Sequence, residues 1–221
     1  IYDSKYREPI KVPEIFLASN YFISVAKLKT SDQERITCTL KNQFGCIPGR
    51  KERYHPWLSQ VIVDINHALT PDLCIIDAVF AMEGRGPTSG TPRRMNLIIV
   101  GKNPVATDSI AARVMGMSPR SIPHLKKATK RGLGEIDKAT IAGEDIEEIE
   151  EKFKFIPSYA YATFRLDDFF QRMASRFQRF GSLIHIVGAF LCDMKRYLSV
   201  LEGLSVPEIK RKIQFFYDER T

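Results

Sequence analysis

Basic and amide side chains near the end of one predicted strand suggest anion-binding chemistry. Lys27 and Lys29 are two residues apart in the run KLKT, so on a regular strand both point to the same face, with Thr30 next along the chain. Lys41 and Asn42 follow in the next predicted element. Such cations bind phosphate or carboxylate groups. The pattern predicts a cationic pocket, although ordinary surface lysines at a strand end would give the same spacing.

Glu83 is the best candidate for a general base, in the turn EGRGP. Gly84 and Gly86 beside it let the backbone approach a ligand closely. In the mechanism that these residues suggest, Lys29 and the other lysines bind an anionic group while Glu83 moves a proton or holds a metal. Lys29 and Glu83 are thus the predicted catalytic pair, and the three glycines Gly45, Gly84 and Gly86 are predicted to line the ligand site.

The third predicted strand ends in GKNPVATD, which adds Asn103 and Asp108 to the predicted ligand-binding residues. Asp108 lies near the start of a predicted helix, where it could instead complement the helix dipole. His55, His67 and His124 have no neighbouring ligand at metal spacing, so we expect no metal site formed by sequence-local ligands.

An α/β fold is needed to position these side chains. Short apolar runs alternate with amphipathic stretches of about a dozen residues, as in layered α/β domains. We expect a layered sheet with flanking helices and a helical C-terminal appendage. The expected strands are 21–26, 73–80 and 95–100, with a last short element at 139–142; the expected helices are 36–44, 57–69, 104–116, a basic one from 124 and an acidic one after 143.

The three loops form one site only if the strands are parallel, because ligands bind at the carboxyl ends of strands in open α/β sheets. If 73–80 and 95–100 pair as an antiparallel hairpin, their loops fall at opposite ends and the site divides. The run 73–80 is almost continuously apolar, which predicts a strand covered on both faces.

Two parts are expected: an α/β domain over 1–154, itself the C-terminal part of a larger domain, and a helical appendage over 155–221. The first residues are polar and lack an initiator Met, hence the expectation of a longer protein. Residues 164–191 carry a phenylalanine-rich stripe at helical spacing with arginines opposite. This stripe is predicted to pack on the parent domain or on a protein partner such as a second subunit; a membrane surface is the alternative.

Composition restricts the class of protein. With 44% hydrophobic and 27% charged residues, the chain is unlike disordered, collagen-like or coiled-coil sequences, and no apolar run is long enough to span a bilayer. Four scattered cysteines and the absence of a signal peptide favour reduced thiols and a cytoplasmic location. The net charge of +7 allows a small anion, or less favourably a nucleic acid, as partner. The common nucleotide, hydrolase and calcium motifs are absent.

Four motifs in series resemble the family called domain of unknown function 362. They are SVAKLKTSDQERITCTLKNQFGCIPG, PDLCIIDAVFAMEGRGPTSGTP, NLIIVGKNPVATDSIAARVMGMSP and HLKKATKRGLGE, and the resemblance covers roughly 21–153. It implies that a longer stretch of chain precedes these motifs, and that an iron–sulfur cluster, which some members carry, would belong to a missing region or a partner. Many relatives read KTH where this chain reads KTS, so Ser31 stands in the histidine place.

Two function classes remain open. The leading hypothesis is a small-molecule or redox-linked enzyme that binds an anionic substrate at the strand-end loops. The rival is a non-catalytic module that docks on a protein complex or nucleic acid through its phenylalanine-rich stripe and the basic residues Lys126, Lys127, Lys130 and Arg131. The sequence does not decide whether the protein is an enzyme, and no motif in it encodes a cofactor.

Overall fold

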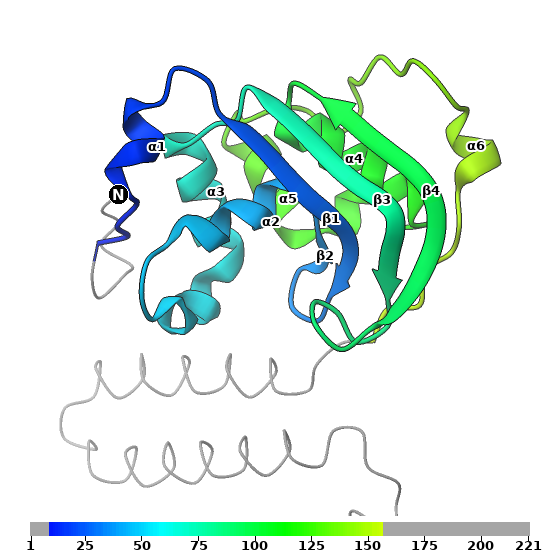
Figure 1. Ribbon diagram of the computed structural model, residues 1–221, viewed down its shortest axis with the longest axis horizontal. Coiled ribbons are helices and arrows are strands. Elements are labelled where there is room, and N and C mark those ends of the chain that lie inside the picture. Colours follow the sequence, from blue (N-terminus) through cyan, green and yellow to red (C-terminus); the bar gives the residue numbers. More distant parts are fainter. Residues whose placement is uncertain (1–8, 157–221) are drawn as a thin grey trace, which may run out of the picture. The chain divides into compact units, whose positions relative to one another are not determined.

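A four-stranded mixed sheet is the framework of the protein in the computed structural model, which describes residues 9–156 (Figure 1). The strand order is β2-β1-β3-β4. The strands are β1 (Ile23–Ser31), β2 (Arg35–Thr37), β3 (Leu73–Glu83) and β4 (Thr91–Gly101). Together with its flanking helices, this sheet confirms the predicted α/β class.

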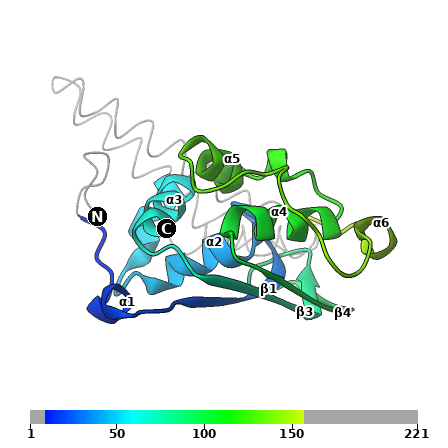
Figure 2. The same cartoon turned by 90° about the horizontal axis from the view of Figure 1, so that it is seen from above.

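The larger described helices lie on one face of the sheet (Figure 2). The α-helices are α1 (Glu14–Ala18), α2 (Thr39–Asn42), α3 (Leu58–Ala68), α4 (Pro104–Val114), α5 (Pro123–Lys130) and α6 (Ile146–Ile149); the 3-10 helices are η1 (Gln43–Cys46), η2 (Lys51–Trp57) and η3 (Pro119–Ser121). In α3 the apolar stripe Leu58, Val61, Ile62 and Ile65 is buried, as its spacing predicts. The core therefore lies between the sheet and these helices.

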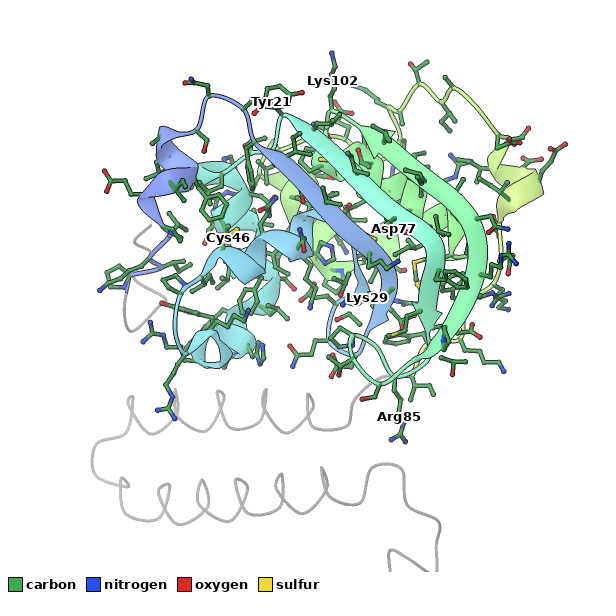
Figure 3. The ribbon with its side chains drawn as sticks, in the orientation of Figure 1. Tyr21, Lys29, Cys46, Asp77, Arg85 and Lys102 are labelled. Atoms are coloured by element: carbon green, nitrogen blue, oxygen red, sulfur yellow. The ribbon has the colours of Figure 1, made fainter. Side chains whose placement is uncertain are left out.

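Strand direction separates the loops that the sequence had grouped. β1 and β3 are parallel, whereas β3 and β4 form an antiparallel hairpin. The ends of β1 and β3 thus meet at one end of the sheet, and the loop after β4 falls at the other. Figure 3 shows Lys29 and Arg85 at the first end and Lys102 at the second. The loop after β4 is therefore separated from the loops after β1 and β3, which is the divided arrangement expected for an antiparallel hairpin.

Two predicted elements differ in the structure. The expected helix 36–44 begins as β2, because Arg35–Thr37 pairs with the end of β1 and buries Ile36 opposite Thr30. Residues 139–142 form no helix or strand, and the acidic stretch forms only the short helix α6. The helical stripe expected at 164–191, and with it nearly all of the predicted appendage, lies outside the described residues.

Only one face of the sheet is covered by the described residues. Leu28, Ile76 and Ala78 are buried under the helices, whereas Val25 and Ile98 on the other face are more than half exposed. The prediction that 73–80 is covered on both faces is therefore not met within residues 9–156.

Candidate functional site: the β1–β2 hairpin

The hairpin of β1 and β2 brings four polar side chains to one face. Lys29 is opposite Thr37 and Ser31 is opposite Arg35 in the antiparallel register. Residues directly opposite each other in an antiparallel pair share a face, as do residues two apart on one strand. Lys29, Ser31, Arg35 and Thr37 therefore form one polar group, here named the hairpin site together with Lys41.

Several polar atoms of the hairpin site are buried without a partner. Ser31 is 1% exposed and Thr37 is 8% exposed, and neither Ser31 Oγ nor Thr37 Oγ1 has a hydrogen-bond partner among the described residues. The same holds for Arg35 Nε. Burying such a group unpaired costs about 1–3 kcal/mol, so folded proteins rarely leave several together. All three groups can donate a hydrogen bond, which suits an acceptor-rich anion.

Arg35 adopts a backbone conformation that side chains rarely occupy. Its φ of 69° lies in the left-handed region. The guanidinium lies over the ring of Phe155, 5.2 Å from the ring centroid. Non-glycine residues in this region cost free energy and are concentrated at binding and catalytic sites. The strained backbone and the stacked ring hold Arg35 in place at the start of β2.

Lys41 on α2 adds a half-buried cation to the hairpin site. Burial lowers the pKa of Lys41, and Lys29 and Lys51 lower it further, while Glu34 and Asp32 raise it. Within residues 9–156 neither the Lys29 nor the Lys41 ammonium group makes an ion pair or hydrogen bond. A bound anion would relieve the repulsion between them.

A buried carboxylate anchors the turn that joins β1 to β2. Glu34 is fully buried; it accepts hydrogen bonds from Ser59 Oγ (2.6 Å) and from the backbone N–H of His124 (3.1 Å). His124 Nδ1 lies 2.9 Å from the same Glu34 oxygen. These bonds tie the turn to α3 and α5, so the polar face of the hairpin is built on a fixed support.

Asp108 and Asn103 hold helix ends and are not part of the hairpin site. Asp108 is fully buried and accepts hydrogen bonds from the backbone N–H groups of Thr39 (2.8 Å) and Leu40 (2.9 Å). Burial raises its pKa. Asn103 Oδ1 accepts from Ala106 N (3.0 Å) and so caps α4. The structure thus gives both predicted ligand residues a structural role, and Asp108 positions α2, which carries Lys41.

Lys27 and Asn42 are also engaged elsewhere. Lys27 Nζ lies 2.8 Å from Asp77 on β3, and this hydrogen bond lowers the pKa of Asp77. Asn42 Nδ2 donates to Val25 O (3.2 Å) and so ties α2 to β1. Of the polar residues predicted from the first strand and α2, only Lys29 and Lys41 contribute side chains to the hairpin site.

The turn after β3 packs directly against the hairpin. Thr30 Oγ1 donates to Gly84 O (3.1 Å), and the backbone N–H of Asp32 donates to Gly86 O (3.2 Å). A side chain at Gly86 would overlap the backbone carbonyl of Thr30. These contacts bring the KLKT and EGRG loops together, and Gly86 is needed for the close packing, whereas Gly84 adopts a left-handed φ of 82°. Gly45 lies exposed in η1, with open space around it.

Glu83 does not share a ligand with Lys29 in this fold. Lys29 is the register partner of Met82, so the next residue, Glu83, points to the opposite face of the sheet. The Glu83 carboxylate pairs with Arg93 (2.9 Å) and accepts from the backbone N–H of Lys154 (2.8 Å). These hydrogen bonds, that from Lys154 first, lower its pKa. The Glu83 carboxylate is thus held by Arg93 and the Lys154 N–H on the face opposite to Lys29. The mechanism in which Glu83 and Lys29 act on one small ligand does not fit this arrangement.

Sequence reasoning missed several residues of the site and of its support. The sequence places Arg35 in a loop and Thr37 in a helix, and nothing in it singles out Glu34. The alternation of Ile36 with Arg35 and Thr37 is the signal that a short strand would give, but three residues are too few for a period to stand out. Ser31 was noticed only because relatives carry histidine there.

The described residues do not fit an iron–sulfur cluster. Within residues 9–156 no group of three or more His, Cys, Asp or Glu side chains could hold a metal ion. Cys38 and Cys74 are free and buried, and burial raises the pKa of Cys74 to about 12. Protonated thiols of this kind are poor metal ligands. No step of the function is derived through a cluster.

Comparison with known proteins places this fold in a family. Residues 2–113, just over half of the chain, match the model described as "Domain of unknown function (DUF362)". The chain therefore belongs to this family, and the resemblance seen in the motifs is confirmed. The match begins before the stretch 21–153 on which the motifs were recognised and ends earlier.

One relative carries a descriptive name. The chain is 28% identical over 141 residues to "Thylakoid-associated protein sll1697" of Synechocystis sp., a match that covers 59% of this chain and 43% of that protein. The chain thus spans less than half the length of this relative. No solved structure matches the chain significantly. In residues 9–156 no helix is both long and apolar enough to cross a membrane.

Proposed function

We propose that the hairpin site binds a small anionic ligand through a phosphate or carboxylate group. The observation that carries the proposal is a set of buried donors that have no partner within residues 9–156, Ser31 Oγ, Thr37 Oγ1 and Arg35 Nε. Lys29 and Lys41 add two ammonium groups that make no ion pair among the same residues. An anion supplies acceptors for all of these groups at once. Charge-assisted hydrogen bonds of this kind are stronger than neutral ones.

The proposal concerns binding and names no reaction. Glu83 faces away from the hairpin site, so it is not assigned as a general base for a ligand held there. The family description names no activity that would add one. A cytoplasmic location fits the free cysteines Cys38, Cys46 and Cys74 and is part of the proposal.

Calorimetric titration of the chain with inorganic phosphate, and separately with citrate, tests the proposal. Ser31→Ala combined with Thr37→Val removes two donors with little change of shape, and Lys29→Met removes a charge. Because a hydrogen bond to a charged group contributes about 1.5–3 kcal/mol, we expect each variant to weaken binding by roughly tenfold or more.

Lys27→Met is the matched control for Lys29→Met. It removes the same group two residues earlier on the same face of β1, but from a lysine already paired with Asp77. We expect it to bind both anions as the unmodified chain does. Equal losses in the two lysine variants, or no binding of either anion at millimolar concentration, would exclude the hairpin site.

A second candidate is docking on a nucleic acid through the basic end of α5. Lys126, Lys127, Lys130 and Arg131 are all exposed there, which is the arrangement that phosphate backbones require. In that case affinity for a short duplex would fall steeply with salt, and each of several lysine substitutions would reduce the salt dependence. A duplex affinity that these substitutions leave unchanged would exclude this candidate.

A further inference from the structure

Residues 151–155 form a segment that returns from α6 to the end of the sheet where β3 turns into β4 (Figure 1), here named the strap. At its start, the backbone N–H of Phe153 donates to Met115 O (3.1 Å), just after the end of α4. At its end, the backbone N–H of Gly84 donates to Lys154 O (2.8 Å). The strap therefore links α4 to the turn that packs against the hairpin site.

Arg93 on β4 fastens the strap to the sheet. Its Nε donates to Glu151 Oε2 (2.6 Å), and its Nη1 donates to Glu83 Oε2 (2.9 Å). Nη1 also donates to Lys152 O (3.1 Å), and the guanidinium lies over the ring of Phe153, 5.0 Å from the ring centroid. Hydrogen bonds between charged groups are stronger than neutral ones. One side chain thus holds three consecutive residues of the strap.

The strap has little apolar burial of its own. Phe153 is 5% exposed and belongs to the core, whereas Lys152 and Lys154 are exposed and Phe155 is half-buried. Segments with few buried apolar contacts open at a lower free energy than the core of a protein does. We therefore expect the strap to open without global unfolding, in an equilibrium that a ligand can bias.

The end of the strap reaches the hairpin site at Arg35. The guanidinium of Arg35 lies over the ring of Phe155, 5.2 Å from the ring centroid. An aromatic ring attracts a guanidinium electrostatically and leaves its N–H groups available to other acceptors. Arg35 Nε is one of the buried donors that have no partner within residues 9–156. The position of this donor therefore depends on Phe155, and through Phe155 on the strap.

We propose that the strap positions Arg35 for the anion, so that anion binding and closure of the strap stabilise each other. The inference rests on the proposed function, because it concerns the same site. Phe155 supports Arg35 directly. Arg93 pairs with Glu83 on the face opposite to Lys29, so it is a positioning residue that acts through the strap. Because coupling in binding free energy is reciprocal, a bound anion slows opening of the strap, and a loosened strap weakens anion binding.

Hydrogen exchange of the full chain, followed by mass spectrometry of peptides that cover 148–156, measures opening of the strap. We expect saturating inorganic phosphate to slow exchange there by about threefold to tenfold, the size expected for a contact between a guanidinium and a ring. Arg93→Met should speed this exchange and weaken phosphate binding, measured by calorimetry, by a similar factor. Arg94→Met is the matched control, because Arg94 is the next residue and its Nε donates to Asn96 on the same strand. In about 0.15 M salt, which screens the loss of a distant charge, it should change neither quantity.

Substitutions of Phe155 separate positioning from packing. Phe155→Tyr keeps a ring beside Arg35, whereas Phe155→Leu keeps an apolar side chain without a ring. We expect the tyrosine variant to bind phosphate as the unmodified chain does and the leucine variant to bind it about threefold to tenfold more weakly. In an Arg35→Ala background, Phe155→Leu should have no further effect on binding, because no guanidinium is left for the ring to hold.

The outcomes distinguish failure of this inference from failure of the hairpin site. The inference is overturned, and the hairpin site stands, if phosphate binds and Lys29→Met weakens it but exchange of the strap does not respond to phosphate. Equal phosphate affinity of the tyrosine and leucine variants of Phe155 would overturn it as well, and this comparison decides the question even if Arg93→Met does not fold. No phosphate binding by the unmodified chain would refute the hairpin site and the coupling together.

Discussion

Replacing Arg35 separately by glycine and by alanine isolates backbone strain from ligand binding at the hairpin site. Both variants lack the guanidinium and its contact with Phe155, so they differ only in a methyl group at a residue whose φ is 69°. Alanine pays the left-handed penalty of roughly 1–2 kcal/mol, whereas glycine avoids it and loses about 0.5–1 kcal/mol through the flexibility of the unfolded chain. Glycine should therefore be the more stable of the two by about 0.5–1 kcal/mol.

Urea unfolding measures the stability difference, and phosphate calorimetry measures binding in the same samples. A difference near 1 kcal/mol corresponds to a melting temperature about 2–4 °C higher for the glycine variant in a domain of this size. Binding should fall by the same factor in both variants, because both lack the same donor. Equal stability of the two would show that the backbone is unstrained, and unchanged phosphate affinity would show that Arg35 does not contact the ligand.

Three further outcomes follow from the contacts around the site. Because burial lowers the pKa of Lys41, phosphate affinity should begin to fall at a pH below the ordinary lysine value of 10.5. Lys41→Arg should remove that decline, since arginine stays protonated. If the decline persists in the variant, it belongs to another group. Asp108→Ala should lower the free energy of unfolding by about 2–3 kcal/mol, because two buried N–H groups lose their acceptor. Asp108→Asn should lower it by less. Equal losses of unfolding free energy in the two variants, measured by denaturant unfolding, would contradict this. Gly86→Ala should cost about 1–3 kcal/mol by overlap with Thr30, whereas Gly45→Ala, with free space around it, should be nearly neutral in the same assay.

The regular elements were predictable where apolar periodicity extends over many residues. α3 buries one side over eleven residues, so its spacing is visible in the sequence, whereas α4 is buried on most of its surface and is indicated by the proline in its first turn. β3 and β4 are both predicted by the sequence, but each strand is longer than expected. The additional residues lie next to the turn that joins the two strands, where the apolar pattern does not continue. The direction of β4 could not be predicted, since a strand reads the same in either pairing.

The candidate site was predicted only in part, for reasons of topology. Lys29 and Lys41 were recognised because cations near a strand end are visible in sequence. Asp108 was grouped with them, but its carboxylate is directed to the N–H groups of Thr39 and Leu40. The contacts between β1 and β2 determine which side chains are buried without a partner. No local pattern in the sequence predicts those contacts.

Diffraction from crystals of the chain soaked in selenate tests the central claim most directly, because selenium gives an anomalous signal and selenate has the shape and oxygen acceptors of phosphate. The hairpin site predicts an anomalous peak with selenate oxygens within hydrogen-bond distance of Ser31 Oγ and Thr37 Oγ1, adjacent to Lys29. That peak should vanish in Lys29→Met crystals and persist in Lys27→Met crystals. Peaks found only at α5, or no peak at the hairpin at millimolar selenate, would contradict the assignment of this site.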